Sequence, residues 1–240
     1  MPTTLKPLNR FEVKYLVATR AADELIAELG EYITPDPHSE DQRGYSIYSV
    51  YWDSAGWRFF WEKLEGYKQR SKLRFRRYLG CEDVFLEIKD REDRTLRKRR
   101  AVWPAERVAR AFGDGSRLDW ELAADDPVAA AAMTLIERYR LAPKVAIRYR
   151  RRALFGRFDP ELRVTFDSRL QYRCDALDIA QPFERGKYLL DPRVTVMEIK
   201  YNHRAPIWLT KLIRRRELNL VRMSKYCTAI DCEYFERQLT

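Results

Sequence analysis

The chain has 240 residues, and 45% of them are hydrophobic, which suffices for one large domain or two small ones and excludes a disordered chain. Lys and Arg number 46 against 36 Asp and Glu, so the net charge of +10 favours a negatively charged partner such as nucleic acid, a phosphate compound or a membrane surface. Four scattered cysteines and two histidines argue against a zinc site or a disulfide framework. We find neither an apolar signal core nor a run of about 18 apolar residues, and we expect a cytoplasmic protein without a membrane span.

Strand patterns dominate the chain, and helical patterns interrupt them. The expected strands alternate apolar with polar residues, whereas the expected helices place apolar residues three and four apart. Thr19 is the expected N-cap of the first helix, and Pro127 opens an Ala-rich one. In chain order we expect a strand at 10–17, a helix at 20–29, a strand at 45–52, a helix at 57–64, a meander of strands at 72–78, 84–89 and 95–102, helices at 105–112 and 127–139, strands at 144–154, 162–169 and 194–201, and helices at 206–217 and 224–237.

Charged residues occupy every second position of four strand-like segments. Successive side chains of a strand point to opposite faces, so each segment gathers its charges on one face. A solvated outer face would mix Thr, Ser, Gln and Asn rather than repeat Glu-x-Lys and Arg-x-Arg units. For any single residue a structural ion pair is the alternative, but the whole set indicates a basic, carboxylate-bearing interior. The segments are 10–15, 72–76, 85–89 and 197–201.

The short connections of the meander favour antiparallel neighbours. A sheet with one charged face cannot bury that face dry, because unpaired charges in a low dielectric are costly. Closure solves this problem, since the charges then line a water-filled bore and helices cover the apolar outer face. We therefore expect an α+β protein with a closed antiparallel β-barrel of about eight strands and helices packed outside. No linker or internal repeat divides the chain, which predicts one domain over 1–240.

The composition of the charged faces suits phosphate. Arginine offers a planar fork that matches phosphate oxygens, and lysine supplies a movable point charge. Carboxylates among these cations are poor phosphate ligands but good ligands for Mg²⁺ or Mn²⁺. The sequence has no GxxxxGK[ST] loop, so a nucleotide would bind through another architecture. In the strand at 144–154, charge falls on both faces, and the pattern does not decide whether Tyr149 and Arg151 or their neighbours point inward.

The ordered series of motifs resembles the VTC domain, the polyphosphate polymerase module of the triphosphate tunnel metalloenzyme (CYTH-like) superfamily. The resemblance covers about residues 8–231. It implies a tunnel of about eight antiparallel strands, in which Lys and Arg bind a nucleoside triphosphate or a phosphate chain and a carboxylate holds a divalent metal. The motifs that carry it lie at 10–15, 51–54, 73–78, 85–89, 196–201 and 224–226.

The charged faces and this resemblance together give a candidate site. The resemblance implies that Glu198 holds the metal, Mn²⁺ or Mg²⁺. The run 97–100 should contribute another tunnel residue, but its register is ambiguous. The expected catalytic residues are Lys14, Arg74, Arg76, Lys89, Arg151, Arg163 and Lys225, and the expected substrate contacts are Glu12, Lys72, Tyr149, Lys200 and Ser224.

The expected function is transfer of the γ-phosphoryl group of ATP to a growing inorganic polyphosphate chain. One alternative is a triphosphatase that hydrolyses tripolyphosphate or a nucleoside triphosphate. Another is a non-catalytic module that binds polyphosphate or nucleic acid. We expect no specific nucleic acid, because Phe75, Leu86 and Ile199 alternate away from the charges. The first strand carries Glu-x-Lys rather than the Glu-x-Glu-x-Lys of the wider superfamily. This difference argues against the interpretation as a hydrolase that uses two metal ions. The oligomeric state is left open.

Overall fold

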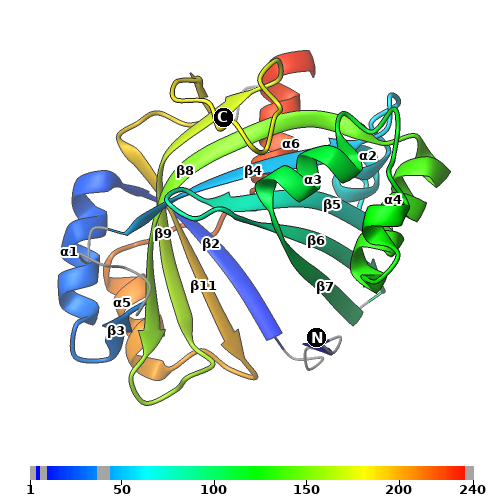
Figure 1. Cartoon of the computed structure of the whole chain (residues 1–240). Helices are drawn as coiled ribbons and strands as arrows, with labels where there is room; N and C mark the ends of the chain where they lie inside the picture. Colours follow the sequence, from blue (N-terminus) through cyan, green and yellow to red (C-terminus); the bar gives the residue numbers. More distant parts are fainter. Residues whose placement is uncertain (1–3, 6–9, 37–43, 94, 236–240) are drawn as a thin grey trace.

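An antiparallel sheet of eleven strands forms the body of the protein (Figure 1). The computed structural model describes residues 4–5, 10–36, 44–93 and 95–235. The strand order is β1-β7-β6-β5-β4-β8-β9-β11-β2, with β3 beside β8 and β10 beside β9. The strands are β1 (Thr4–Leu5), β2 (Arg10–Ala18), β3 (Ile33–Pro35), β4 (Tyr45–Asp53), β5 (Gln69–Tyr78), β6 (Asp83–Glu92), β7 (Thr95–Pro104), β8 (Ala142–Gly156), β9 (Arg163–Arg173), β10 (Lys187–Tyr188) and β11 (Val194–Asn202).

Helices connect and cover the strands. Among the described residues, none of these helices combines the length and the apolar character that crossing a membrane requires. A 3-10 turn at Glu121–Ala123 precedes the fourth helix, and a π turn at Asp231–Phe235 follows the last one. The helices are α1 (Thr19–Leu29), α2 (Arg58–Leu64), α3 (Ala105–Phe112), α4 (Pro127–Tyr139), α5 (Ile207–Arg215) and α6 (Lys225–Ile230).

The sheet curls strongly but is not closed by hydrogen bonds, so the expectation of a closed barrel of about eight strands is corrected. Strands β2 and β7 end the series of long strands, and within the described part of the chain no pairing joins them. The free edge of β2 is instead met by a loop, whose Val221 N–H donates to the Lys14 carbonyl at 2.8 Å. The edge of β7 pairs with the two residues of β1. Short segments thus occupy edge groups that would otherwise pair across the gap.

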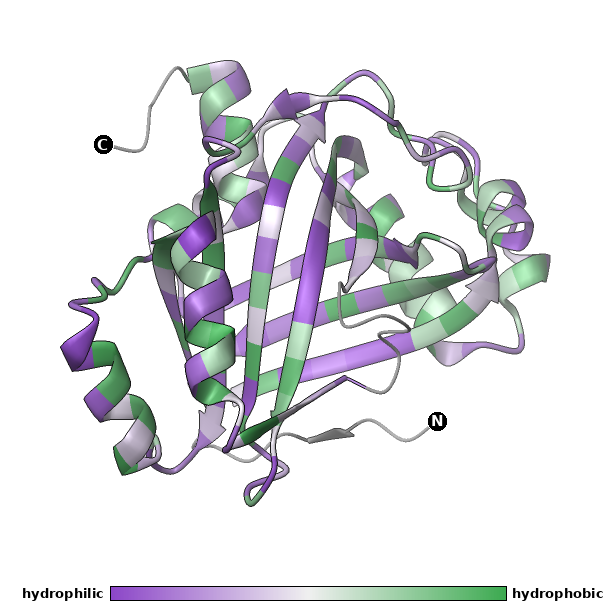
Figure 2. Cartoon of the chain, turned by 90° about the vertical axis from the view of Figure 1, so that its left-hand side faces the viewer, coloured by the Kyte–Doolittle hydropathy of each residue, from purple (hydrophilic) through white to green (hydrophobic). Residues whose placement is uncertain are grey.

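Many apolar side chains of the strands point outward beneath α1, α3, α4 and α5, while another apolar cluster, with Ile147 and Val196, packs against α6 on the inner face. Helices α3 and α4 cover β4 to β7, where Phe75 and Leu86 are buried. Helices α1 and α5 cover β2, β9 and β11, where Phe166 and Ile199 are buried. The bands of alternating hydropathy along the strands are visible in Figure 2. This packing leaves the opposite face of each strand, which carries the charges, turned inward.

The long elements lie where the sequence pattern puts them, and the differences are local. Thr19 is the first residue of α1 rather than its N-cap, because its hydroxyl shares a 3.0 Å hydrogen bond with the Thr195 hydroxyl. The helix expected at 224–237 is shorter, since α6 ends at Ile230 and continues as the π turn, while 236 and 237 fall outside the described residues. Strands β1, β3 and β10 have only two or three residues, too few for a period to show.

Candidate active site

The inner face of the curled sheet is the face turned away from α1, α3, α4 and α5, and it carries most of the buried charge. Cations outnumber carboxylates on it, so it is electropositive. Helix α6 begins over this face and adds Ser224 and Lys225. The polar side chains of the inner face include Glu12, Lys14, Lys72, Arg74, Arg76, Glu87, Lys89, Lys98, Arg100, Tyr149, Arg151, Arg163, Thr165, Asp167, Glu198 and Lys200.

Glu87 organises the β5–β7 side of the inner face. Arg74, Glu87 and Arg100 lie directly opposite one another on three neighbouring strands. The fully buried Glu87 carboxylate accepts from Arg74 at 2.6 Å and from Lys98 and Arg100 at 2.5 Å. Burial alone would raise the pKa of Glu87, but the surrounding guanidinium and ammonium groups, led by Arg74, lower it far below its ordinary value. One ionised carboxylate therefore fixes three cations.

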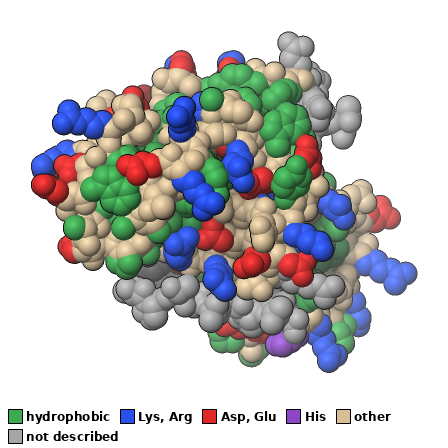
Figure 3. Space-filling model, turned by 90° about the vertical axis from the view of Figure 1, so that its right-hand side faces the viewer, with side chains coloured by type: hydrophobic (Ala, Val, Ile, Leu, Met, Phe, Trp, Pro, Cys, Tyr) green, Lys and Arg blue, Asp and Glu red, His purple; other side chains and the backbone are tan. Residues whose placement is uncertain are grey.

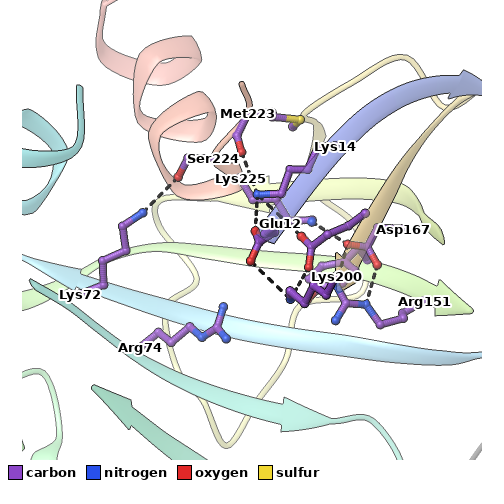
Figure 4. Close-up of polar contacts among 12 residues, drawn as sticks. Glu12, Lys14, Lys72, Arg74, Arg151, Asp167, Lys200, Met223, Ser224 and Lys225 are labelled. Carbon is purple, nitrogen blue, oxygen red and sulfur yellow. Dashed lines mark hydrogen bonds and ion pairs between the residues drawn. The ribbon is translucent and has the colours of Figure 1, made fainter. Parts of the chain in front are cut away.

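Three further cations on this side have no carboxylate partner among the described residues. Arg76 donates to the Ser49 hydroxyl at 3.2 Å and to the Tyr149 hydroxyl at 3.1 Å. Lys72 donates to the Ser224 hydroxyl at 3.2 Å, as Figure 4 shows, and burial lowers its pKa. The repulsion of Arg74, followed by burial, lowers the pKa of Lys89 well below its ordinary value. A bound anion would offset both the desolvation cost of these cations and their mutual repulsion.

The β2–β11 side pairs its cations with two carboxylates (Figure 4). Lys14 lies 2.9 Å from a Glu12 oxygen and 3.6 Å from a Glu198 oxygen, while Lys200 lies 3.5 Å from Glu12 and also pairs with Glu198. Burial and the Glu198 charge raise the pKa of Glu12, but Lys200 and Lys14 outweigh them and lower it to about 2. Burial also raises the pKa of Glu198, and Lys200 and Lys14 bring it well below its ordinary value. Both carboxylates are thus ionised at neutral pH.

Asp167 ties the start of α6 to the sheet. Its buried carboxylate accepts two hydrogen bonds from Arg151, at 2.6 and 2.7 Å, and one from Lys225 at 2.6 Å. Burial raises the pKa of Asp167, and Arg151 and Lys225 lower it to about 2. Lys14 donates to the Met223 carbonyl at 3.1 Å on the other side of the same turn. Strands far apart in sequence therefore hold Ser224 and Lys225 over the inner face.

The motif at 51–54 contacts α6 through Tyr51 and Asp53. The fully buried Asp53 carboxylate accepts the backbone N–H groups of Phe59 and Phe60 at 2.9 and 3.0 Å, which caps α2, and it also accepts the Tyr226 hydroxyl. The Tyr51 ring stacks on Tyr226 with centroids 5.4 Å apart, and its hydroxyl accepts from Arg74 at 3.2 Å. Our sequence reasoning quoted this motif but assigned no role to Asp53 or Tyr226.

The structure decides the registers that the sequence left open. Tyr149 and Arg151 both lie on the inner face, next to a β-bulge between Arg148 and Arg150. In the run 97–100, Lys98 and Arg100 reach Glu87 from the inner face, whereas Arg99 pairs with Asp90 on the other face at 2.8 Å. All the candidate residues of strands and α6 are thus brought to the inner face or its rim. Glu87, Lys98, Arg100 and Asp167 join them, although the sequence reasoning did not choose them.

Arg163 lies at the end of this arrangement. Its guanidinium is 3.6 Å from an Asp36 oxygen and sits over the Phe155 ring, 5.0 Å from the centroid. Its Nε is buried without a hydrogen-bond partner in the described part of the chain. Because guanidinium donors are costly to bury unsatisfied, an acceptor that reached this nitrogen would be stabilised there.

The inner face contains a carboxylate pair that fits a hard divalent ion. The described residues include no group of three or more His, Cys, Asp or Glu side chains that could hold a metal. Mg²⁺, however, is bound in many sites by one or two carboxylates together with substrate phosphates and water. Glu12 and Glu198 are ionised neighbours, and the Thr165 hydroxyl, which lies opposite Glu198 in the sheet, is buried without a partner in the described residues. These oxygen donors match that mode of binding.

These features define an antiparallel β protein with a curled sheet, a basic inner face and a small number of ionised carboxylates. The sequence matches the VTC domain family over residues 9–234, and the chain belongs to that family. This confirms the recognition made from the order of its motifs.

Solved structures are similar to this chain at low identity, and the first of them shares its fold. A Bacillus halodurans protein described as a "putative adenylate cyclase" superposes with a TM-score of 0.55 at 12% identity, covering 94% of this chain and 97% of that one. A Hippeastrum adenylyl cyclase homologue, described as having a dominant triphosphatase activity, gives a TM-score of 0.46 at 12% identity, covering 92% and 94%. No curated protein matched the sequence.

Proposed function

We propose that this protein synthesises inorganic polyphosphate by moving the γ-phosphoryl group of ATP to the end of a growing phosphate chain, with release of ADP. The observation that carries the proposal is the asymmetry of the inner face in a member of the VTC domain family. Lys72, Arg76 and Lys89 lack carboxylate partners in the described residues, while an ionised carboxylate pair lies on the strands opposite. A phosphate chain with a divalent ion supplies the charges that complete both sides.

The β5–β6 side would bind the triphosphate. Arg74 is held rigid by Glu87 and Tyr51, so its remaining donors are oriented before the ligand arrives. Arg76 offers a second fork, and Lys72 and Lys89 offer point charges that follow the ligand. This division supports binding of several consecutive phosphates rather than a single one.

The α6 side would steady the transferring and accepting ends. Ser224 and Lys225 begin the helix, Arg151 lies beside them through their shared partner Asp167, and Arg163 keeps an unpaired donor. Phosphoryl transfer needs in-line phosphates and neutralised equatorial oxygens, and it requires no covalent protein intermediate. Lys14, Lys200 and Tyr149 complete the contacts in this proposal.

A divalent ion, Mn²⁺ or Mg²⁺, would be held by Glu198, with Glu12 beside it, and would supply charge neutralisation between adjacent phosphates. Lys14 and Lys200 orient the two carboxylates in the absence of ligand. We further propose that the two sides of the sheet act together as one catalytic domain, since each contributes groups that the reaction needs.

The test is incubation of the purified protein with ATP and Mn²⁺, with the products separated by chain length on a gel and free phosphate measured in parallel. A ladder of polyphosphate supports the proposal, and Glu198→Gln should remove the ladder. Free phosphate without a ladder would replace the polymerase with a triphosphatase. Binding of polyphosphate with neither product, in competition with duplex DNA, would indicate a non-catalytic binding module.

A further inference from the structure

The row of basic side chains on the inner face continues past the candidate active site. Arg70 and Arg91 lie directly opposite each other on β5 and β6, two residues beyond the opposed pair Lys72 and Lys89. Because strand positions two apart share a face, all four cations project from the same side of the sheet. Like charges placed directly opposite each other are destabilising, and two such pairs stand in succession here.

Neither arginine has a carboxylate partner among the described residues. Arg70 donates to the Tyr67 carbonyl at 3.0 Å, and Arg91 donates to the Asp93 carbonyl at 2.8 Å. A guanidinium has five N–H donors, so each side chain is anchored by one and keeps the rest. Arg91 is exposed and Arg70 is partly buried, which places the pair at the solvent end of the row.

Helix α2 brings a third cation to this end. Burial, followed by the charge of Arg70, lowers the pKa of Lys63, and the charges of Lys14 and Arg91 act in the same direction. Lys63 also contributes to the lowered pKa of Lys72. The ammonium of Lys63 therefore lies within electrostatic range of Arg70, Arg91 and Lys72. Lys and Arg side chains, interspersed with Asp and Glu, are spread across the middle of the face on which α2 and α4 lie (Figure 3).

We propose that Arg70, Arg91 and Lys63 form an outer phosphate subsite, which holds the part of a linear polyphosphate chain that extends beyond the phosphates bound at Arg74, Arg76 and Lys89. The polyphosphate as ligand rests on the function proposed above. Four strand residues advance about 13 Å, so Arg70 stands well outside the position of Arg74. A triphosphate bound at the inner cations leaves the outer subsite empty, whereas a longer chain fills both. The subsite thus makes affinity increase with chain length.

The experiment compares two ligands on the same variants, by calorimetry with tripolyphosphate and with a long-chain polyphosphate, in the absence of ATP. In the double variant Arg70→Gln/Arg91→Gln, affinity for the long chain should fall about tenfold, the scale of one lost charge-assisted contact, while affinity for tripolyphosphate stays within about twofold. Arg97→Gln is the matched control, since Arg97 is an exposed cation on the same hairpin but opposite Asp90 on the other face. It should leave both affinities unchanged.

The charge-retaining variant Arg70→Lys/Arg91→Lys separates a binding role from a folding defect, because it should keep most of the long-chain affinity. Equal losses for both ligands, no loss for either, or a wild-type protein that does not distinguish the two chain lengths would overturn the outer subsite. The polymerase proposal fails separately. If the wild-type protein makes no polymer from ATP, but the double variant binds the long chain more weakly than the wild type, the polymerase is refuted and the outer subsite stands. Conversely, wild-type product lengths and affinities in the double variant would remove the subsite and leave the polymerase.

Discussion

The two sides of the inner face use carboxylates differently. On the β5–β7 side, Glu87 is fully buried and holds Arg74, Lys98 and Arg100, while the neighbouring lysines are left with excess positive charge. On the β2–β11 side, Glu12 and Glu198 share Lys14 and Lys200 in a four-membered cluster. The first arrangement fixes the orientation of three cations, and the second keeps two carboxylates ionised beside each other.

The balance of positive and negative charge on each side, rather than the number of charges, therefore distinguishes the two sides. Two ionised carboxylates in proximity repel each other, and the Lys14 and Lys200 ammonium groups beside them offset this repulsion. Lys72 and Lys89, on the β5–β7 side, have the opposite imbalance, because they lack carboxylate partners among the described residues. Glu198→Gln tests the β2–β11 side, and substitutions at Arg74, Arg76 and Lys98 test the β5–β7 side. Tyr226→Phe tests the contact of α6 with the sheet.

Glu198→Gln should have the largest effect. The substitution removes one of the two adjacent carboxylate charges at nearly constant size, and it leaves the phosphate-binding cations in place. We expect turnover to fall by a factor on the order of 10²–10³, with triphosphate binding and the unfolding curve close to wild type. Steady-state kinetics across a Mn²⁺ titration measures this, with the exposed Glu106→Gln on α3 as a control. Wild-type activity at limiting metal would contradict a metal role for Glu198.

Arg74→Ala and Arg76→Ala should each weaken triphosphate binding by about 1.5–3 kcal/mol, the scale of a hydrogen bond to a charged group. They should differ in stability. Arg74→Ala removes one of the cations on the buried Glu87 and should lower the free energy of unfolding by about 1–3 kcal/mol, whereas Arg76 has only hydroxyl partners. Calorimetry and urea denaturation measure the two effects. A larger binding loss in Arg77→Ala, whose side chain bonds carbonyls on the other face, would show that the register is wrong.

Triphosphate affinity should fall as the pH rises through about 8. Burial lowers the pKa of Lys98 to about 8 despite its Glu87 partner, so the ligand-free protein loses positive charge in this range. An anion raises this pKa, and binding near pH 8 should therefore take up protons. Calorimetry in buffers of different ionisation enthalpy detects the uptake. Lys98→Arg should flatten the profile, because a guanidinium stays protonated, and an affinity unchanged between about pH 7 and 9 in the wild type would refute this account.

Tyr226→Phe should have the smallest effect. The ring can still stack on Tyr51, but the Asp53 carboxylate loses one of its donors, which should lower the free energy of unfolding by about 1 kcal/mol. Since Ser224 and Lys225 precede Tyr226 in the same turn, we expect KM for ATP to rise a few fold with little change in kcat. An unaltered KM together with unaltered stability would mean that the Asp53 contact does not position α6.

The alternation of the sequence predicts which side chains share a face of a strand. It puts Lys72, Arg74 and Arg76 on one face of their strand and Glu87 and Lys89 on one face of theirs, because a strand has a period of two. The pairing of Arg74 with Glu87 and of Lys72 with Lys89 across the two strands comes from the structure. The order of the motifs also sufficed to recognise the VTC domain. Where alternation carried charge on both faces, as around Arg151, the pattern had no information about direction.

How the faces meet depends on packing between elements. The Val221 loop contacts the edge of β2, and β1 pairs with the edge of β7. The contacts that bring α6 to Asp53 and Asp167 join residues more than 50 positions apart, and the bulge near Arg148 lies between two strands that are adjacent in the sheet. Such contacts leave no period in the sequence, because they arise from packing between elements rather than from the geometry of any one strand or helix.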